Sequence, residues 1–291
     1  MTTTFLDQLS GYIWLNGDLV KWQDARVHAL THSLHYAGAV FEGERSYGGR
    51  VFKIHEHTER LLASASTMQM QVPYSFDEII AAHESIIVKN KISDAYIRPL
   101  VWRGAESLNL TNKSLSINFM IAAIASSPKP ADNVSLHISR WRKPHPDSWP
   151  PQVKSSGHYA MMLVALEEAK LQGYSDAILL DWRGYIAECT TTNIFFVYKD
   201  RVITPIADSF LNGITRQTII SLAKKLGLEV QEKHISLSDI EKYDECFLTG
   251  TAAEIKLVNS IALHSLQITF ADNRITSLLQ QEYAALTRSE Q

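Results

Sequence analysis

The feature that most constrains this fold is a short stretch of turn-forming residues near the middle of the chain. Residues 126–133 read Ser-Ser-Pro-Lys-Pro-Ala-Asp-Asn, rich in turn formers and poor in apolar side chains, which is typical of a linker between domains. The 291 residues suffice for two cores, because a single core rarely grows beyond about 250–300 residues. We expect a small N-terminal α/β domain over 1–125, a linker over 126–137 and a larger C-terminal domain over 138–291.

Both parts carry local signals of strands and helices. Asn16-Gly17 and Gly48-Gly49 stand between apolar runs and predict β-hairpin turns. Ser75 and Glu78 have the spacing of a capping box, which predicts a helix start. The combination of strand and helix signals in both parts indicates a mixed α/β fold with two lobes. In such proteins ligands commonly bind in the cleft between the domains. Helices are expected over 55–68, 76–87, 158–172 and after Gly213, and strands over 95–102, 116–125, 134–140, 176–181, 185–189 and 194–198.

Charge and composition exclude several classes of partner. The chain has 28 Lys+Arg against 31 Asp+Glu, with no basic run, so we expect no nucleic acid and no membrane as partners. The apolar run 117–125 is far too short to span a bilayer, and the first residues do not resemble a signal peptide. Two cysteines without a C-x-x-C spacing offer neither a disulfide framework nor a zinc ribbon. We expect a cytoplasmic protein that acts on small metabolites.

Three features could bind a compact anion. Residues 211–217, LNGITRQ, run from a glycine into a helix start, where free amides and the helix dipole favour a phosphate. Arg60, on a predicted helix, is a planar cation suited to phosphate. Residues 248–254, LTGTAAE, are small enough for successive backbone amides to face one anionic oxygen. The first two have ordinary alternatives, namely a plain helix entry and an exposed helix arginine.

Histidines raise the alternative of a metal site. His28, His32 and His35 have helical-face spacing, and His55 and His57 flank a glutamate. Metal coordination needs three or four converging ligands, and neither run has the H-E-x-x-H pattern. We therefore expect no metal, and we interpret these histidines as capping or core residues.

Lys154 stands in QVKSSGHYAMM, after a proline-rich loop and before a helix-like run. Taken alone, a loop lysine is most often a solvated charge. Seven motifs change that interpretation, because together they stand in the order and spacing of the branched-chain aminotransferases of pyridoxal-phosphate fold type IV, which this chain resembles over most of its length. The motifs are LHYAGAVFEGERSY, HTERL, AYIRPL, KSSGHY, GYIAE, NGITR and LTGTAAE.

The resemblance implies a two-domain fold with the active site in the cleft between the domains and pyridoxal 5'-phosphate as cofactor. It implies that Lys154 binds the cofactor aldehyde and carries the substrate proton, because a lysine amine can lose its charge when buried or near a cation. It implies that Glu188 keeps the pyridine nitrogen protonated and that Tyr159 contacts the phenolic oxygen. The phosphate is expected on Arg60, Ile214, Thr215 and Thr251, the substrate carboxylate on Tyr96, Thr251 and Ala252, and the substrate side chain among Tyr36, Phe41 and Arg98.

The implied activity is reversible amino transfer between branched-chain L-amino acids and 2-oxoglutarate, with amino acids and 2-oxo acids as partners. The resemblance also implies a homodimer in which residues near Tyr36 or in the linker reach the partner's site, and it leaves a higher assembly of dimers open. One segment departs from the family: after Glu188 the chain reads Cys-Thr-Thr-Thr-Asn instead of a glycine-rich run. That segment is closer to D-amino-acid transaminases and 4-amino-4-deoxychorismate lyases, so those enzymes and the (R)-amine transaminases stay alternatives.

Overall fold

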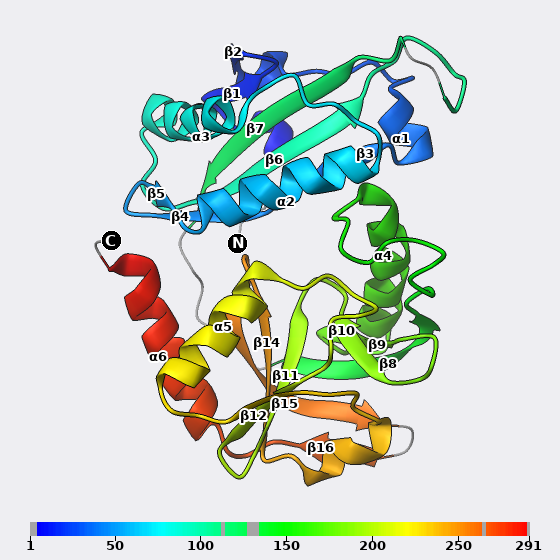
Figure 1. Ribbon diagram of the computed structural model, residues 1–291, viewed down its shortest axis with the longest axis vertical. Helices are drawn as coiled ribbons and strands as arrows, with labels where there is room; N and C mark the ends of the chain where they lie inside the picture. Colours follow the sequence, from blue (N-terminus) through cyan, green and yellow to red (C-terminus); the bar gives the residue numbers. More distant parts are fainter. Residues whose placement is uncertain (1–4, 112–113, 127–133, 264–265, 290–291) are drawn as a thin grey trace. The chain divides into compact units, whose positions relative to one another are not determined.

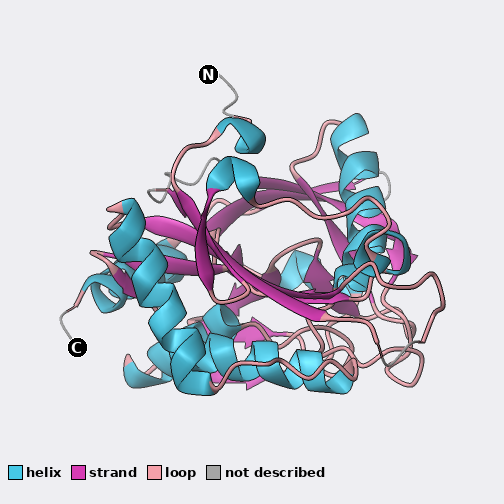
Figure 2. Ribbon diagram, turned by 90° about the horizontal axis from the view of Figure 1, so that it is seen from above, coloured by secondary structure: helices cyan, strands magenta, loops and turns pink. Residues whose placement is uncertain are grey.

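The computed structural model describes residues 5–111, 114–126, 134–263 and 266–289. These residues form two compact units, unit 1 of residues 5–126 with 153–158 and unit 2 of residues 134–152 with 159–289. Each unit has its own β-sheet and its own helices (Figures 1 and 2). The expected mixed α/β fold is therefore confirmed, with one sheet in each unit.

The sheet of unit 1 is built around two long antiparallel strands, β6 (Ala95–Arg103) and β7 (Ile117–Ala125), which pair along their whole length. Buried and partly buried residues alternate along β6 as far as Leu100, because successive side chains of a strand point to opposite faces. The order is β2-β1-β7-β6-β4-β5, with β3 paired to β6. The shorter strands are β1 (Tyr12–Leu15), β2 (Asp18–Lys21), β3 (Ala39–Phe41), β4 (Glu44–Tyr47) and β5 (Arg50–Val51).

Both predicted hairpins of unit 1 are confirmed. Strands β1 and β2 pair antiparallel around Asn16 and Gly17, which have φ of 50° and 99°. A two-residue turn with both φ positive matches the twist of the paired strands, and glycine adopts it without steric cost. Gly48 and Gly49 connect β4 and β5 in the same way, with φ of 58° and 85°.

Two helices cover the sheet of unit 1 (Figure 1). The first is α2 (Ile54–Thr67), and the second is α3 (Phe76–Asn90), which begins at the predicted capping box of Ser75 and Glu78. Their buried faces, which include Leu61 and Ile86, share one core with the sheet. The remaining helical segments of this unit are α1 (His32–Tyr36), η1 (Leu6–Gln8) and η2 (Trp22–Asp24).

Unit 2 is organised on a mixed sheet of order β10-β9-β8-β15-β14-β11-β12-β13, with β16 paired to β15. Strand β8 (Val134–Arg142) runs parallel to both of its neighbours, β9 and β15, whereas β11 and β14 pair antiparallel. The other strands are β9 (Asp176–Leu180), β10 (Ile186–Cys189), β11 (Asn193–Tyr198), β12 (Arg201–Thr204), β13 (Val230–Glu232), β14 (Glu245–Gly250), β15 (Glu254–Leu263) and β16 (Leu266–Thr269).

Helices α5 (Ile214–Lys225) and α6 (Arg274–Arg288) lie side by side against the sheet of unit 2 (Figure 1). Helix α5 is the one predicted after Gly213, and Gly227, with φ of 79°, follows its end as expected. The predicted helix over 158–172 is α4 (Ser156–Leu171), and η3 (Leu237–Lys242) is a short 3-10 helix. No helix among the described residues is both long and apolar enough to cross a membrane.

The expected linker falls mostly on residues 127–133, which lie outside the described residues. Residues 134–137 of that expectation are instead the first residues of β8, because Val134 and Leu136 belong to the core of unit 2. The expected placement of the active site in a cleft between domains stays a prediction.

One segment contacts residues far from it in sequence. Residues 153–158 belong to unit 1 although they follow the first strand of unit 2. Val153 is part of the hydrophobic core of unit 1, and Ser155 forms an antiparallel bridge with Val40 at β3. Lys154, expected in the C-terminal domain, is therefore held by the N-terminal sheet.

Candidate active site

The backbone of Lys154 is fixed by hydrogen bonds to two elements of unit 1. The amide of Phe41, at the end of β3, donates to the carbonyl oxygen of Lys154 at 3.1 Å. The amide of Lys154 donates to Oγ of Ser64, on α2, at 3.2 Å. With the bridge between Ser155 and Val40, these contacts hold the lysine on a rigid strand edge rather than on a free loop.

The Lys154 side chain lies among aromatic and cationic groups. Its Nζ is 5.1 Å from the centre of the Phe41 ring, and the guanidinium carbon of Arg98 is 4.5 Å from the centre of the same ring. Arg98 donates to the hydroxyl of Tyr96 at 2.7 Å. Tyr96 and Arg98 are two residues apart on β6 and share a face, as expected. The structure thus brings together four of the predicted site residues.

The surroundings of Lys154 lower the pKa of its amine. Burial lowers its pKa to about 8, opposed by the negative charge of Glu42 and assisted by the charges of Arg60 and Arg98. With a pKa near 8, about a tenth of the amine is neutral at pH 7, against less than about a thousandth for an ordinary lysine. Only the neutral amine is a nucleophile, so this lysine is prepared for attack on a carbonyl carbon.

Arg60 is held by a buried carboxylate that the sequence interpretation did not identify. Arg60 donates from Nε to Oε1 and from Nη2 to Oε2 of Glu42, both at 2.7 Å. Nδ1 of His57 lies 2.8 Å from the same Oε2, and both Glu42 and His57 are buried. Burial alone would raise the pKa of Glu42, but the charges and hydrogen bonds of Arg60 and His57 hold it well below its usual range.

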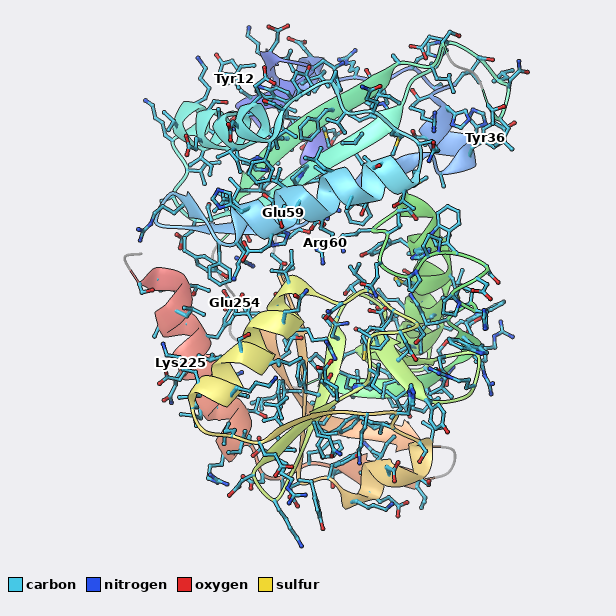
Figure 3. All side chains as sticks on the ribbon, in the orientation of Figure 1. Tyr12, Tyr36, Glu59, Arg60, Lys225 and Glu254 are labelled. Atoms are coloured by element: carbon cyan, nitrogen blue, oxygen red, sulfur yellow. The ribbon has the colours of Figure 1, made fainter. Side chains whose placement is uncertain are left out.

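Tyr36 lies away from Arg60, at one edge of unit 1 (Figure 3). It ends α1, is 45% exposed, and donates from its hydroxyl to the carbonyl oxygen of Leu108 at 3.3 Å. Its ring packs against those of His32 and His35. The structure therefore does not bring Tyr36 into the cluster around Lys154 of the same chain.

In unit 2, Glu188 lies on β10 beside a register irregularity and is almost fully buried. Nζ of Lys143 donates to its Oε1 at 2.9 Å, and Nδ2 of Asn193 approaches its Oε2 at 3.4 Å. Lys143 is itself only 3% exposed. Glu188 is therefore a carboxylate that two neighbouring side chains hold in place.

The start of helix α5 is positioned by the same asparagine. Asn193 Nδ2 donates to the carbonyl oxygen of Leu211 at 3.1 Å, and a Cβ at Gly213 would lie 2.2 Å from its Oδ1. Gly213 is the N-cap and forms no side-chain cap. The first amides of a helix, here those of Ile214 and Thr215, have no partner within the helix itself. Arg216, also buried, stabilises this loop. It donates to the Asn212 side chain and the Pro205 carbonyl oxygen, and it forms an ion pair with Glu232.

The small-residue turn of the LTGTAAE motif follows β14. Thr251 and Ala252 lie between β14 and β15, and a Cβ at the preceding Gly250 would meet Cγ2 of Thr192 at 3.2 Å. Thr192 directly precedes Asn193, which pairs with Thr249 across β11 and β14. The turn at Thr251 and the start of α5 are therefore both linked to the segment that follows Glu188.

The segment that departs from the family pattern is a turn in which Thr191 is exposed and its neighbours are buried. Thr190 donates from Oγ1 to Asp176 at 2.5 Å, and the amide of Cys189 donates to the carbonyl oxygen of Thr192 at 2.8 Å. Burial raises the pKa of the Cys189 thiol well above its ordinary value, so this cysteine is chemically inert. Tyr159, in the first turns of α4, is partly buried.

Two groups of functional side chains result, each described within its own unit. Unit 1 supplies a reactive amine with two arginines, a tyrosine and an aromatic ring. Unit 2 supplies an anchored carboxylate, a helix start suited to an anion and a turn of small residues. In chemical terms, an amine can react with an aldehyde, a buried carboxylate can accept from a cationic heterocycle, and a helix start can hold an anion.

Sequence reasoning missed Glu42, His57, Lys143 and Asn193 as residues that orient the site. Glu42 had one available signal, because a lone acid within the apolar run AGAVFEG must be paired if that run is buried. Lys143 had no such signal, since it pairs with a residue 45 positions away. His57, raised as a metal ligand, contacts Glu42 instead.

Comparisons with known proteins agree with this geometry. Residues 39–261 match the family model of amino-transferase class IV. The chain is 56% identical over 289 residues to a probable branched-chain-amino-acid aminotransferase of Rickettsia felis, covering 99% of this chain and 100% of that protein. The branched-chain aminotransferase of Thermoproteus uzoniensis with norvaline has a TM-score of 0.91 and 33% identity, covering 97% of this chain and 96% of that one. The Thermobaculum terrenum branched-chain amino acid aminotransferase in its PLP form has a TM-score of 0.88 and 30% identity, covering 96% of this chain and 95% of that one.

Proposed function

Because this chain belongs to the class IV aminotransferases, we propose that it reversibly transfers the amino group between branched-chain L-amino acids and 2-oxoglutarate. The observation that carries the proposal is the Lys154 amine, with a pKa of about 8, beside the Arg98–Tyr96 pair and the Phe41 ring. A reactive amine beside an apolar ring and a cation suits a substrate that is apolar in one half-reaction and a dicarboxylate in the other.

The residues fit pyridoxal 5'-phosphate as the cofactor. An amine that is partly neutral near pH 7 can bind an aldehyde, and Glu188 with Lys143 forms a fixed buried anion suited to a protonated ring nitrogen. When bound, this cofactor supplies an electron sink for the charge that develops at the substrate α-carbon. The Thermobaculum terrenum relative was solved in its PLP form, which supports the same choice here.

Each residue then has a role in binding or proton transfer. Lys154 Nζ would hold the cofactor aldehyde, and the same amine would move the proton at the substrate α-carbon. Glu188 would hold the ring nitrogen in its protonated form, and Tyr159 would contact the phenolic oxygen. Arg60, the amides of Ile214 and Thr215, and Thr251 would hold the phosphate.

The substrate is held by groups that act on its two ends. Tyr96 and the amides of Thr251 and Ala252 bind the α-carboxylate. Phe41 forms an apolar wall for a branched side chain, and Arg98 pairs with the distal carboxylate of glutamate. A guanidinium stacked on an aromatic ring can serve both substrates, because the same surface offers a flat apolar face and a charged edge.

We propose that the enzyme is a homodimer joined in part through an exposed apolar surface around α1, the α1 patch. Leu34 is 72% exposed and Tyr36 45% exposed, and the segment with Leu108 and Leu110 is tied to α1 by Tyr36 and His32. Large exposed apolar groups gathered on one surface are typical of an interface. Tyr36 would then form a wall of the partner's substrate pocket. Leu34→Glu should yield monomers by light scattering; an unchanged dimer would exclude this patch as the interface.

A substrate panel tests the activity. L-leucine, L-isoleucine and L-valine should yield glutamate from 2-oxoglutarate, whereas D-alanine and (R)-1-phenylethylamine should not. Transfer from D-alanine or the (R)-amine would assign the chain to one of the alternative transaminases. Pyruvate release from aminodeoxychorismate without amino transfer would assign it to the lyases. A cytoplasmic site of action and assembly beyond the dimer remain predictions.

A further inference from the structure

Glu42 is a fully buried carboxylate to which the proposed function assigns no role. Its two oxygens accept three contacts, two from Arg60 at 2.7 Å and one from His57 at 2.8 Å. Its own amide donates to the carbonyl oxygen of Pro99 on β6 at 3.0 Å. Glu42 is therefore held from both its backbone and its side chain, and it connects β6 to α2.

The geometry of the pair restricts how Arg60 can be used. Both N–H groups on the Nε–Nη2 edge point at Glu42. A bidentate pair holds the plane of the guanidinium as well as its position. Any further acceptor, including a phosphate, must approach from the Nη1 side. Figure 3 shows Arg60 on α2. Ser64, one turn further along the same helix, accepts a hydrogen bond from the Lys154 amide.

Glu42 also balances the charges around the Lys154 amine. The groups of unit 1 that act on this amine are Arg60 from α2, Tyr96 and Arg98 from β6, and Glu42 between β3 and β4. His57, also on α2, faces Glu42. Two arginines without an opposing anion would create a strongly positive field at Nζ. Phe41, next to Glu42, donates its amide to the Lys154 carbonyl, so the carboxylate and the lysine are held on adjacent strand segments.

We propose that Glu42 is a positioning residue that, with His57, holds the Arg60 guanidinium in one orientation and limits the positive field at the Lys154 amine. The part that concerns a bound phosphate rests on the proposed function. The part that concerns Lys154 does not, because it describes the protein without cofactor.

The experiment uses the full-length, cofactor-free protein and three variants. Glu42→Gln removes the charge, and its amide nitrogen would oppose an N–H of Arg60. Glu42→Asp keeps the charge but withdraws it by one methylene. Glu44→Gln is the matched control, because Glu44 is equally buried and pairs with a different histidine, His83.

The first readout is the pH dependence of Lys154 acetylation by acetic anhydride, measured by peptide mass spectrometry. The wild-type midpoint is expected near pH 8. It should fall measurably in Glu42→Gln, because a negative charge that raises the pKa of the amine has been lost. It should be unchanged in Glu44→Gln. A Glu42→Gln midpoint equal to that of the control would overturn the effect on Lys154.

The second readout is the affinity for pyridoxal phosphate, measured by equilibrium dialysis. It should fall about tenfold in Glu42→Gln, as expected for loss of a charge-assisted hydrogen bond, and several-fold in Glu42→Asp. If Glu42→Gln does not fold, the Glu42→Asp variant tests the positioning role instead. A Glu42→Asp protein that binds pyridoxal phosphate as tightly as wild type would refute that role. Absence of leucine transfer in wild type would contradict the proposed function while the acetylation result still tests Glu42.

Discussion

Lys143 donates from Nζ to Oε1 of Glu188 at 2.9 Å, and neither side chain is more than 7% exposed. The two residues are 45 positions apart and meet because β9 lies between β8 and β10 in the sheet of unit 2. Glu188, the carboxylate proposed to pair with the ring nitrogen of the cofactor, is thus already paired with the Lys143 cation in the protein without cofactor.

Removal of that cation should destabilise the protein strongly. Lys143→Met leaves Glu188 as a buried charge without its cation, which costs about 3–5 kcal/mol when a buried pair is broken. Urea unfolding followed by tryptophan fluorescence measures the loss. Lys143→Arg keeps the charge and should lose much less; equal losses in both variants would show that packing, not charge, is responsible.

The proposed roles of Lys154 and Glu188 differ in their spectroscopic consequences. Lys154→Ala should lose the visible absorbance of lysine-bound cofactor on dialysis and lower turnover by at least ~10²–10⁴-fold, because both anchor and proton carrier are removed. Glu188→Gln should retain the cofactor and react slowly. A Lys154→Ala protein with a borohydride-reducible chromophore and full rate would refute the assignment.

The partly buried Lys154 should also lower stability at neutral pH. Folding lowers the pKa of Lys154 from its ordinary 10.5 to about 8, so the unfolded chain binds more protons between these values and stability rises with pH there. Without cofactor, Lys154→Met should be more stable than wild type at pH 7, by at most about 3 kcal/mol, and the difference should shrink from pH 8 towards 10.5. If the urea midpoints of Lys154→Met and wild type differed by the same amount at every pH, the difference would not come from the lowered pKa of Lys154.

The His83–Glu44 pair of unit 1 should make stability fall as the pH rises, which is opposite to the effect of Lys154. Nε2 of His83 lies 3.0 Å from Glu44, and both side chains are fully buried. Burial would lower the pKa of His83, but the neighbouring charge of Glu44 raises it above its ordinary value of 6.5. The stabilisation of the fold by charged His83 is therefore complete below pH 6.5. It disappears as the pH rises through the higher pKa that His83 has in the folded state.

His83→Gln tests this contribution. The variant should lose about 3 kcal/mol on the acid side, because Glu44 loses its buried partner, and less at pH 9. Urea unfolding of both proteins between pH 5.5 and 9 measures the difference. A loss that grows with pH would contradict a charged histidine.

The glycine of the FEG motif should be required for substrate binding. A Cβ at Gly43 would lie 2.4 Å from the Tyr96 hydroxyl, so Gly43→Ala must displace the tyrosine and its hydrogen bond with Arg98. We expect KM for leucine to rise about tenfold, as for the loss of a good hydrogen bond. Gly157→Ala is the fold control, because its Cβ would meet only Ala37 at an ordinary 3.7 Å. An unchanged KM in Gly43→Ala would show that Tyr96 does not bind the substrate α-carboxylate.

Local elements of the fold could be predicted because local backbone preferences specify them. The turn at Asn16-Gly17 needs two positive φ angles, and the capping box at Ser75 satisfies the first amides of a helix with side chains three residues apart. Strands β12 to β16 and helix α6 were not predicted, since no turn or cap of comparable strength marks them. The linker prediction extended too far because Val134 and Leu136 are buried only through the sheet.

The sequence by itself determined the turns, most helix starts and the ordered motifs that identify the family, because each depends on neighbouring residues. Only the tertiary structure decided that Lys154 is held by the sheet of unit 1, that Glu42 holds Arg60 and that Lys143 neutralises Glu188. These pairs join residues 18 to 45 or more positions apart. Their geometry follows from strand register and helix packing, where a shift of one residue would turn a side chain to the opposite face.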